Sequence, residues 1–143
     1  MILADVNVLV YGFRADAPGH AQYLRWWREQ IASQQAFGLA DLALSGFLRI
    51  VTHPRIFDPP SPLEEALRFV KALRDLPNYV EIRPGPRHWE IFVDLCSKAN
   101  ARGNLVPDAF LAALAIESGS ELITTDRDYA RFHGLRWRHP LQQ

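Results

Sequence analysis

Apolar and polar positions follow two rhythms along this chain, and the changes of rhythm predict its elements. Short apolar runs typical of buried strands are separated by stretches in which apolar residues recur every three or four positions, as in helices that cover a sheet. The expected strands are Ile2 to Val10 with a turn at Gly12, Ala36 to Leu39, Tyr79 to Ile82, Glu121 to Thr125, and an edge strand at Leu135 to Trp137. The expected helices are Gly19 to Ala32, Leu42 to Val51, Pro62 to Leu76, Arg87 to Ala101, Val106 to Glu117, and a short one around Asp128 to Phe132. Strands that alternate with helices predict an α/β fold with a mainly parallel sheet of about five strands.

Capping and breaking residues support several of these helix ends. Asp41 is expected to cap the helix that His53-Pro54 stops, and Ser61 with Glu64 resembles a capping box. The Pro-rich loop Asp58 to Pro62 is too short for a domain linker, and the 143 residues suffice for one domain with a real core. We therefore expect a single domain over residues 1–143.

Composition narrows the class of protein. Sixteen basic and sixteen acidic side chains cancel, so net charge does not predict nucleic-acid binding. Arginine greatly outnumbers lysine, which reflects either phosphate recognition or biased base composition in the gene. The single cysteine, Cys96, lies in an apolar helical stretch and is expected to be buried. With no disulfide, signal-peptide pattern or membrane-spanning run, we expect a soluble cytoplasmic protein.

Four aspartates are the strongest indication of chemistry. Asp5 follows the first apolar strand, Asp108 lies in the first turn of a late helix, and Asp126 and Asp128 follow the strand that ends at Thr125. Carboxylates at strand exits and helix starts of an α/β domain line the crevice where ligands bind. Carboxylates that share such a space are most easily reconciled by a divalent cation.

Each aspartate also has a structural interpretation. Asp5 could be compensated by a helix start or an arginine, Asp108 could be a helix-start acid favoured by the macrodipole, and capping alone would explain one of the last pair. Small residues at Ala112 and Ala115 predict that the Asp108 carboxylate faces inward. The neighbouring polar residues expected to orient the carboxylates or contact substrate are Asn7, Asn104 and Thr125, although Asn104 could be only a turn residue.

A cluster of carboxylates without cysteine or histidine is a hard oxygen site that suits Mg²⁺ or Mn²⁺. Magnesium keeps several waters and prefers phosphate oxygens as further ligands, which points to phosphodiester cleavage. The metal would lower the pKa of a bound water and neutralise charge in the transition state, and a second ion would stabilise the leaving oxygen. Asp126 is the expected acceptor of the water's proton.

Several segments resemble the PIN-domain ribonuclease family, and most of all its VapC-type toxins of bacterial toxin-antitoxin pairs. They are Asp5-Val6-Asn7, Arg102 to Ala109, Thr124 to Phe132, and Leu44 to Phe57, the last similar to one subgroup of those toxins. The resemblance implies a PIN-like α/β domain and a Mg²⁺-dependent endoribonuclease that cuts structured RNA such as tRNA or rRNA. It further implies Asp5, Asp108 and Asp126 as catalytic and metal-binding acids, with Asp128 as a further metal ligand.

In one position the chain departs from this family, which commonly has a glutamate in its second helix. Ser45 and Gly46 stand about there, and no acid occupies the position. Asp41, roughly one turn earlier, either compensates by reaching the site or only caps the helix.

The resemblance also implies partners, namely a cognate antitoxin that blocks the site and a second copy of the chain in a homodimer. Trp26, Trp27, Phe47 and Leu48 are expected to be core residues. Exposure of the tryptophans would instead favour docking of an antitoxin or dimer formation.

Alternative functions come from other classes. Receiver-type phosphoacceptors and haloacid-dehalogenase-type phosphatases also use strand-end aspartates with Mg²⁺, but they rely on a late lysine, and no lysine follows Lys98 here. A non-catalytic PIN-like domain that binds RNA or a partner without cutting is the remaining alternative.

Overall fold

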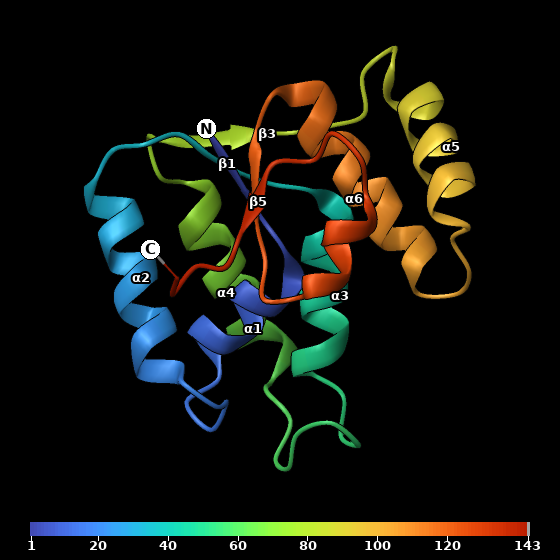
Figure 1. The fold of residues 1–143 in the computed structure, drawn as a ribbon. Helices are drawn as coiled ribbons and strands as arrows, with labels where there is room; N and C mark the ends of the chain where they lie inside the picture. Colours follow the sequence, from blue (N-terminus) through green and yellow to red (C-terminus); the bar gives the residue numbers. More distant parts are fainter. Residues whose placement is uncertain (143) are drawn as a thin grey trace.

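A computed structural model describes residues 1–142 and shows a parallel sheet with helices on both faces (Figure 1). Within these residues the sheet has five strands in the order β3-β2-β1-β4-β5, and every neighbouring pair is parallel. The strands are β1 Ile2–Ala4, β2 Phe37–Leu39, β3 Tyr79–Glu81, β4 Glu121–Ile123 and β5 Trp137–Arg138. The expected α/β class with a parallel sheet is confirmed. Gln143, the last residue of the predicted domain, lies outside the described residues.

Helices cover the sheet in two layers. Their bounds are α1 Val6–Phe13, α2 His20–Ala32, α3 Asp41–Val51, α4 Leu63–Arg74, α5 His88–Ala99 and α6 Leu105–Ser118, with a 3-10 helix, η1, at Arg127–Arg131. The first four α-helices share one apolar core with one face of the sheet, and α5, α6 and η1 share a second core with the other face. No helix in residues 1–142 combines the length and apolar character needed to cross a membrane.

Side-chain alternation along the strands explains why there are two cores. In β1, Ile2 and Ala4 belong to the core under α1 to α4, whereas Leu3 belongs to the core under α5 and α6. In β4, Ile123 and Leu122 divide in the same way. Because successive residues of a strand point to opposite faces, apolar strands without a polar alternation must be buried on both sides.

The strand order places a crevice between β1 and β4. The chain builds β1, β2 and β3 outward in one direction, and then crosses back to add β4 and β5 on the other side of β1. In open parallel sheets, ligands bind at the carboxyl ends of the strands where the order reverses in this way. Asp5 directly follows β1 and Thr124 directly follows β4, so both residues lie at this crevice.

The expected strand Ile2 to Val10 is wrong beyond Ala4. The strand ends there, and residues Val6 to Phe13 form the buried helix α1. Asp5 is the N-cap of this helix, and its Oδ1 accepts a hydrogen bond from the Val6 N–H at 2.7 Å. A short continuous apolar run is compatible with a buried strand or a buried helix. The cap and the packing against neighbouring helices decide in favour of the helix, against the β-branched character of the run.

Two expected caps are also wrong. Position 62 is the N-cap of α4 and makes no side-chain capping bond, so Ser61 and Glu64 form no capping box. The Ser61 hydroxyl instead accepts a hydrogen bond from Nη1 of Arg14 at 3.0 Å. Ala40 is the N-cap of α3, and the exposed Asp41 is its first residue without a side-chain capping bond.

The apolar residues weighed as possible docking surface are core. Trp26, Trp27 and Phe47 are buried, and the partly buried Leu48 packs against the same core. The structure therefore favours the core interpretation of both tryptophans. Cys96 is less buried than expected: it is partly exposed while packing against the core under α5 and α6.

Candidate active site

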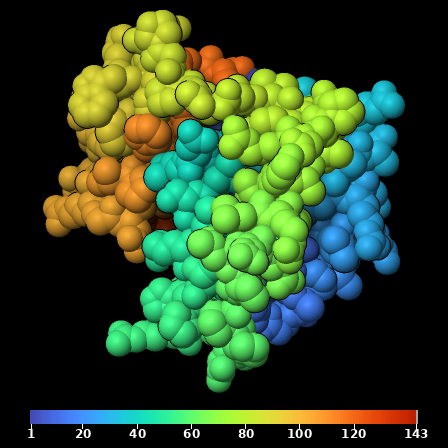
Figure 2. All heavy atoms as spheres, turned by 180° about the vertical axis from the view of Figure 1, so that it is seen from behind, coloured from blue at the N-terminus to red at the C-terminus, as the bar shows by residue number. Residues whose placement is uncertain are grey.

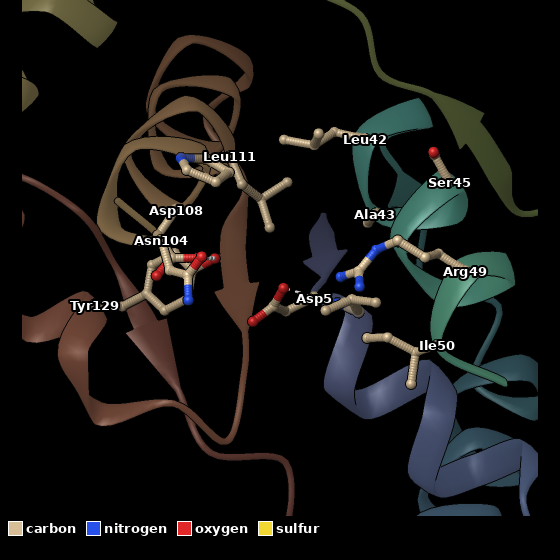
Figure 3. Close-up of a pocket in the computed structure, with 13 residues that line it drawn as sticks. Asp5, Leu42, Ala43, Ser45, Arg49, Ile50, Asn104, Asp108, Leu111 and Tyr129 are labelled. Carbon is tan, nitrogen blue, oxygen red and sulfur yellow. Dashed lines mark hydrogen bonds between the residues drawn. The ribbon is translucent and has the colours of Figure 1, made fainter. Parts of the chain in front are cut away.

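A cleft lies between α3 and α6 at the carboxyl ends of β1 and β4. Its volume is about 380 Å³. In Figure 2 the recess separates the orange atoms of α6 from the teal atoms of α3. The polar and charged side chains that line it are Asp5, Ser45, Arg49, Asn104, Asp108 and Tyr129. The close-up in Figure 3 shows Asp5 at the base, with Asp108, Asn104 and Tyr129 on one wall and Arg49 on the other.

Asp5 is held by hydrogen bonds to both of its carboxylate oxygens. Oδ1 caps α1, while Oδ2 accepts hydrogen bonds from the Thr124 hydroxyl at 2.7 Å and from Nδ2 of Asn7 at 3.1 Å. The expected strand Ile2 to Val10 would put Asn7 on the same face as Asp5. Asn7 instead lies in α1 and reaches Asp5 from the first turn of that helix. The carboxylate is therefore fixed in orientation, as a ligand or charge-stabilising group requires.

Thr124 connects the two strand ends, and sequence reasoning missed it. Besides donating to Asp5, its Oγ1 accepts hydrogen bonds from Nδ2 of Asn7 at 3.3 Å and from the Asp126 N–H at 3.1 Å. Thr125, the residue that the sequence predicts instead, takes part through its backbone N–H, which donates to Oδ1 of Asn7 at 3.2 Å. The available signal was position: Thr124 is the first residue after β4, as Asp5 is after β1.

Asp108 and Tyr129 form the opposite part of the site. Asp108 lies in the first turn of α6, whose residues Ala112 and Ala115 are fully buried, so the carboxylate faces inward as expected. The Tyr129 hydroxyl donates a hydrogen bond to Oδ1 of Asp108 at 3.3 Å. Tyr129 is buried, and its pKa is raised far above the ordinary value by burial and by the nearby Asp5 and Asp108 charges. The phenol therefore stays protonated and acts only as a donor to Asp108.

The last two aspartates have different surroundings. Asp126 caps η1, because its Oδ1 accepts a hydrogen bond from the Asp128 N–H at 2.8 Å. Its N–H donates to Oγ1 of Thr124, which in turn donates to Asp5, so Asp126 lies beside the site. After burial, its charge adds to the raised pKa of Asp5 and Asp108. Asp128 is exposed and has Nε of Arg131 3.9 Å from its Oδ1. Asp126 thus combines the capping role with proximity to the site, and Asp128 faces solvent.

The electrostatics of the cleft favour the binding of a cation. Burial is the largest cause that raises the pKa of Asp5, partly offset by its hydrogen bonds from Thr124 and Val6. Burial, followed by repulsion from Asp5 and Asp126, raises the pKa of Asp108 from 3.8 to about 6. Buried carboxylates that repel one another are stabilised by a positive charge that binds between them.

The acids do not form a closed metal cage. Within residues 1–142, no group of three or more histidine, cysteine, aspartate or glutamate side chains is arranged to hold a metal ion. Two carboxylates, Asp5 and Asp108, line the cleft itself. This arrangement suits Mg²⁺, which retains several waters and is commonly bound by one or two carboxylates together with substrate phosphates.

The wall formed by α3 has no glutamate at the position where the PIN-domain family commonly has one. Ser45 and Gly46 line the cleft at that position, and a Cβ on Gly46 would lie only 3.3 Å from Cγ2 of Val6. Asp41 does not compensate, because it is exposed and lies outside the cleft lining. The charged residue that α3 contributes is Arg49.

Thr124→Val tests whether activity requires the orientation of the Asp5 carboxylate as well as its presence. Valine keeps the shape but leaves Oδ2 of Asp5 and the Asp126 N–H without their shared partner, so we expect a loss of about 1–3 kcal/mol in the free energy of unfolding. We expect the RNA cleavage that the family resemblance implies to fall about 10- to 100-fold, as when groups that orient metal ligands are removed. Urea denaturation and single-turnover cleavage measure the two effects.

Thr124→Ser is the matched control, since it retains the hydroxyl and should keep most of the activity. Equal activity in the valine and serine variants would show that the hydroxyl does not position Asp5.

The fold is shared with solved toxin-antitoxin proteins. One is a chain of VapBC2 from Rickettsia felis bound to a DNA fragment from its promoter, with a TM-score of 0.69 over 97% of this chain and 98% of that one. Its sequence identity is 15%, so this likeness establishes the arrangement of elements alone.

Sequence comparison goes further. The model of the PIN domain matches residues 2–135. A VapC ribonuclease of Mycobacterium bovis is 46% identical over 99% of this chain and 96% of its own length. Ribonuclease VapC25 of Mycobacterium tuberculosis is 40% identical over 98% of this chain and 99% of its own. With the cleft at the β1 and β4 strand ends and these full-length matches, the chain belongs to the PIN-domain family, among its VapC-type ribonucleases.

Proposed function

We propose that this chain is a Mg²⁺-dependent endoribonuclease, the toxin of a toxin-antitoxin pair, which hydrolyses phosphodiester bonds in structured RNA such as tRNA or rRNA. The observation that carries the proposal is the pair Asp5 and Asp108, which face one cleft. The pKa values of both are raised, first by burial, and that of Asp108 is raised further by repulsion from Asp5 and Asp126. A cation bound between two such carboxylates stabilises their charged forms. VapC-type PIN ribonucleases depend in general on a divalent metal, and Mg²⁺, with Mn²⁺ as a substitute, is the ion we propose here.

Asp5 and Asp108 would hold the metal, with Asp126 acting directly or through water. The donor set is oxygen alone, as Mg²⁺ prefers. When bound, the ion supplies an acidified water and neutralises negative charge on the phosphate. Asp128, which faces solvent, is the weakest of the proposed ligands.

The other residues of the site orient these groups. Thr124 and Asn7 fix the Asp5 carboxylate, and Tyr129 donates to Asp108. Asn104 lines the cleft beside Asp108 and is available for a substrate contact, whereas Thr125 acts through its backbone. Asp126 is the proposed acceptor of the proton from the attacking water, because its carboxylate is held by the Asp128 N–H and its own N–H bonds to the Thr124 hydroxyl that holds Asp5.

The proposed partners are a cognate antitoxin, a second copy of the chain, and RNA. The solved VapBC2 neighbour is a toxin-antitoxin protein of the same fold, which supports an antitoxin for this chain as well. We propose that the protein acts in the cytoplasm, where its RNA targets are.

Incubation of the purified protein with bulk bacterial tRNA and rRNA tests the proposal. We expect discrete cleavage products with Mg²⁺ or Mn²⁺ and none in EDTA, and growth arrest when the protein is expressed in a bacterial host without its antitoxin. Sequencing of RNA ends after brief induction would locate the cuts. RNA binding without cleavage under any of these metal conditions would instead identify a non-catalytic PIN-like domain. Cleavage without growth arrest would retain the nuclease and reject the toxin role.

A further inference from the structure

One side of α3 faces the cleft, and its charged member is an arginine. Leu42, Ser45, Gly46 and Arg49 all line the cleft. Their spacing of three and four residues places them on one stripe of the helix. The buried residues Leu44, Phe47 and Val51 lie on the side of α3 that packs into the core. Arg49 is thus presented to the cleft by the register of α3.

The Arg49 guanidinium points across the cleft toward Asp5 (Figure 3). It nevertheless makes no ion pair within 4.0 Å and no side-chain hydrogen bond to any residue in the range 1–142. Arg14 provides the contrast, since its guanidinium bonds to Asp16, Pro59 and Ser61. Arg49 is therefore not used as an internal counter-ion for the acids or as a structural clamp, and its donors face the open cleft.

The charges of the cleft are divided between its walls. The carboxylates of Asp5 and Asp108 lie at the base and on the α6 side, and the Arg49 guanidinium lies on the α3 side. The carboxylates suit a metal ion. The guanidinium suits a phosphate, because its planar fork of donors matches two phosphate oxygens. An acid on α3 would add to the metal ligands, whereas an arginine there adds a contact to the substrate.

We propose that Arg49 binds the phosphodiester of the RNA substrate from the α3 wall, opposite the metal-binding carboxylates. This inference rests on the proposed ribonuclease function, because it names the residue that holds the substrate in the same cleft. Arg49 positions the phosphate and does not hold the metal.

The test separates substrate binding from metal binding. Fluorescently labelled bulk tRNA is titrated with the wild type, Arg49→Gln and Arg49→Lys in EDTA at several salt concentrations. We expect Arg49→Gln to bind roughly tenfold more weakly at low salt, as for the loss of a charge-assisted hydrogen bond, and to lower the salt slope by about 0.7 to 0.9. Arg49→Lys should keep the slope while binding more weakly than the wild type, because it retains the charge without the fork.

Metal binding is measured in parallel with Mn²⁺ alone, by electron paramagnetic resonance of the free ion. We expect Arg49→Gln to bind Mn²⁺ as tightly as the wild type or more tightly, because a like charge has left the cleft. Arg28→Gln, an exposed arginine on α2, is the matched control that removes the same charge elsewhere. It should change neither the RNA salt slope nor Mn²⁺ binding.

Three results would overturn the role of Arg49: RNA binding by Arg49→Gln equal to that of Arg28→Gln, a clear loss of Mn²⁺ affinity in Arg49→Gln, or no salt-dependent RNA binding by the wild type. The ribonuclease proposal fails separately. A wild type that binds RNA through Arg49 but cuts nothing would reject the nuclease and retain the contact. A wild type and Arg49→Gln that bind and cut RNA equally would retain the nuclease and reject the contact.

Discussion

Replacement of Asp108 by asparagine is expected to lower the rate of RNA cleavage by about 10²- to 10³-fold while the protein remains folded. Asparagine fills the same space and can still accept from Tyr129, whose hydroxyl lies 3.3 Å from Oδ1 of Asp108. It lacks the negative charge that would bind the metal from α6. Single-turnover cleavage of bulk tRNA in Mg²⁺ measures the effect.

The same substitution is expected to remove part of the pH dependence of stability in metal-free protein. The pKa of Asp108 is raised to about 6, first by burial and then by repulsion from Asp5 and Asp126. The folded state therefore keeps this proton to a higher pH than the unfolded state does, so the free energy of unfolding falls as the pH rises from about 4 to about 6. The fall should be on the order of 1 kcal/mol, because solvent screens a partly exposed carboxyl.

Asp94→Asn is the control for both measurements. Asp94 is an exposed residue of α5 that pairs with Lys98 at 3.0 Å, outside the cleft. It should leave cleavage unchanged and the decline of stability between about pH 4 and 6 in place. Wild-type activity in Asp108→Asn would refute the metal site that we propose.

Phe47→Ala should have the largest effect on the fold. The Phe47 ring is 0% exposed and forms a three-ring cluster with Phe13 and Phe69, at centroid distances of 5.3 and 5.5 Å. Removing it leaves a cavity at the junction of α1, α3 and α4, which should cost about 3–5 kcal/mol. Since a domain of this size is stable by only about 5–15 kcal/mol, much of the variant should unfold at modest urea concentrations. Urea denaturation followed by circular dichroism measures the shift.

Trp89→Ala tests whether burial, and not aromatic size, sets this cost. Trp89 is the larger side chain, but it is 68% exposed on the outer side of α5. We expect its loss to change the free energy of unfolding by no more than about 0.5 kcal/mol. Equal costs for the two alanine variants would contradict the core that the structure describes.

The order of the later elements and the family could be predicted from sequence. Helices and strands after Gly19 lie within a few residues of their expected bounds, because each has its own periodicity and its own breaking residues. The family resemblance was correct because its motifs recur in order along nearly the whole chain. The first helix was missed because residues 6–13 are almost uniformly apolar, and such a run carries no period to distinguish helix from strand.

The sequence by itself determined the class of fold, the family, and a set of aspartates at strand ends and a helix start. Tertiary structure decided how these residues are used: Asp5 as a helix cap fixed by Thr124, Asp108 inside the cleft with Tyr129, and Asp128 turned to solvent. It also brought Arg49 to the wall opposite the acids. The physical reason is that periodicity is a property of one segment, whereas side-chain direction and charge at a site arise where β1, β4, α3 and α6 meet.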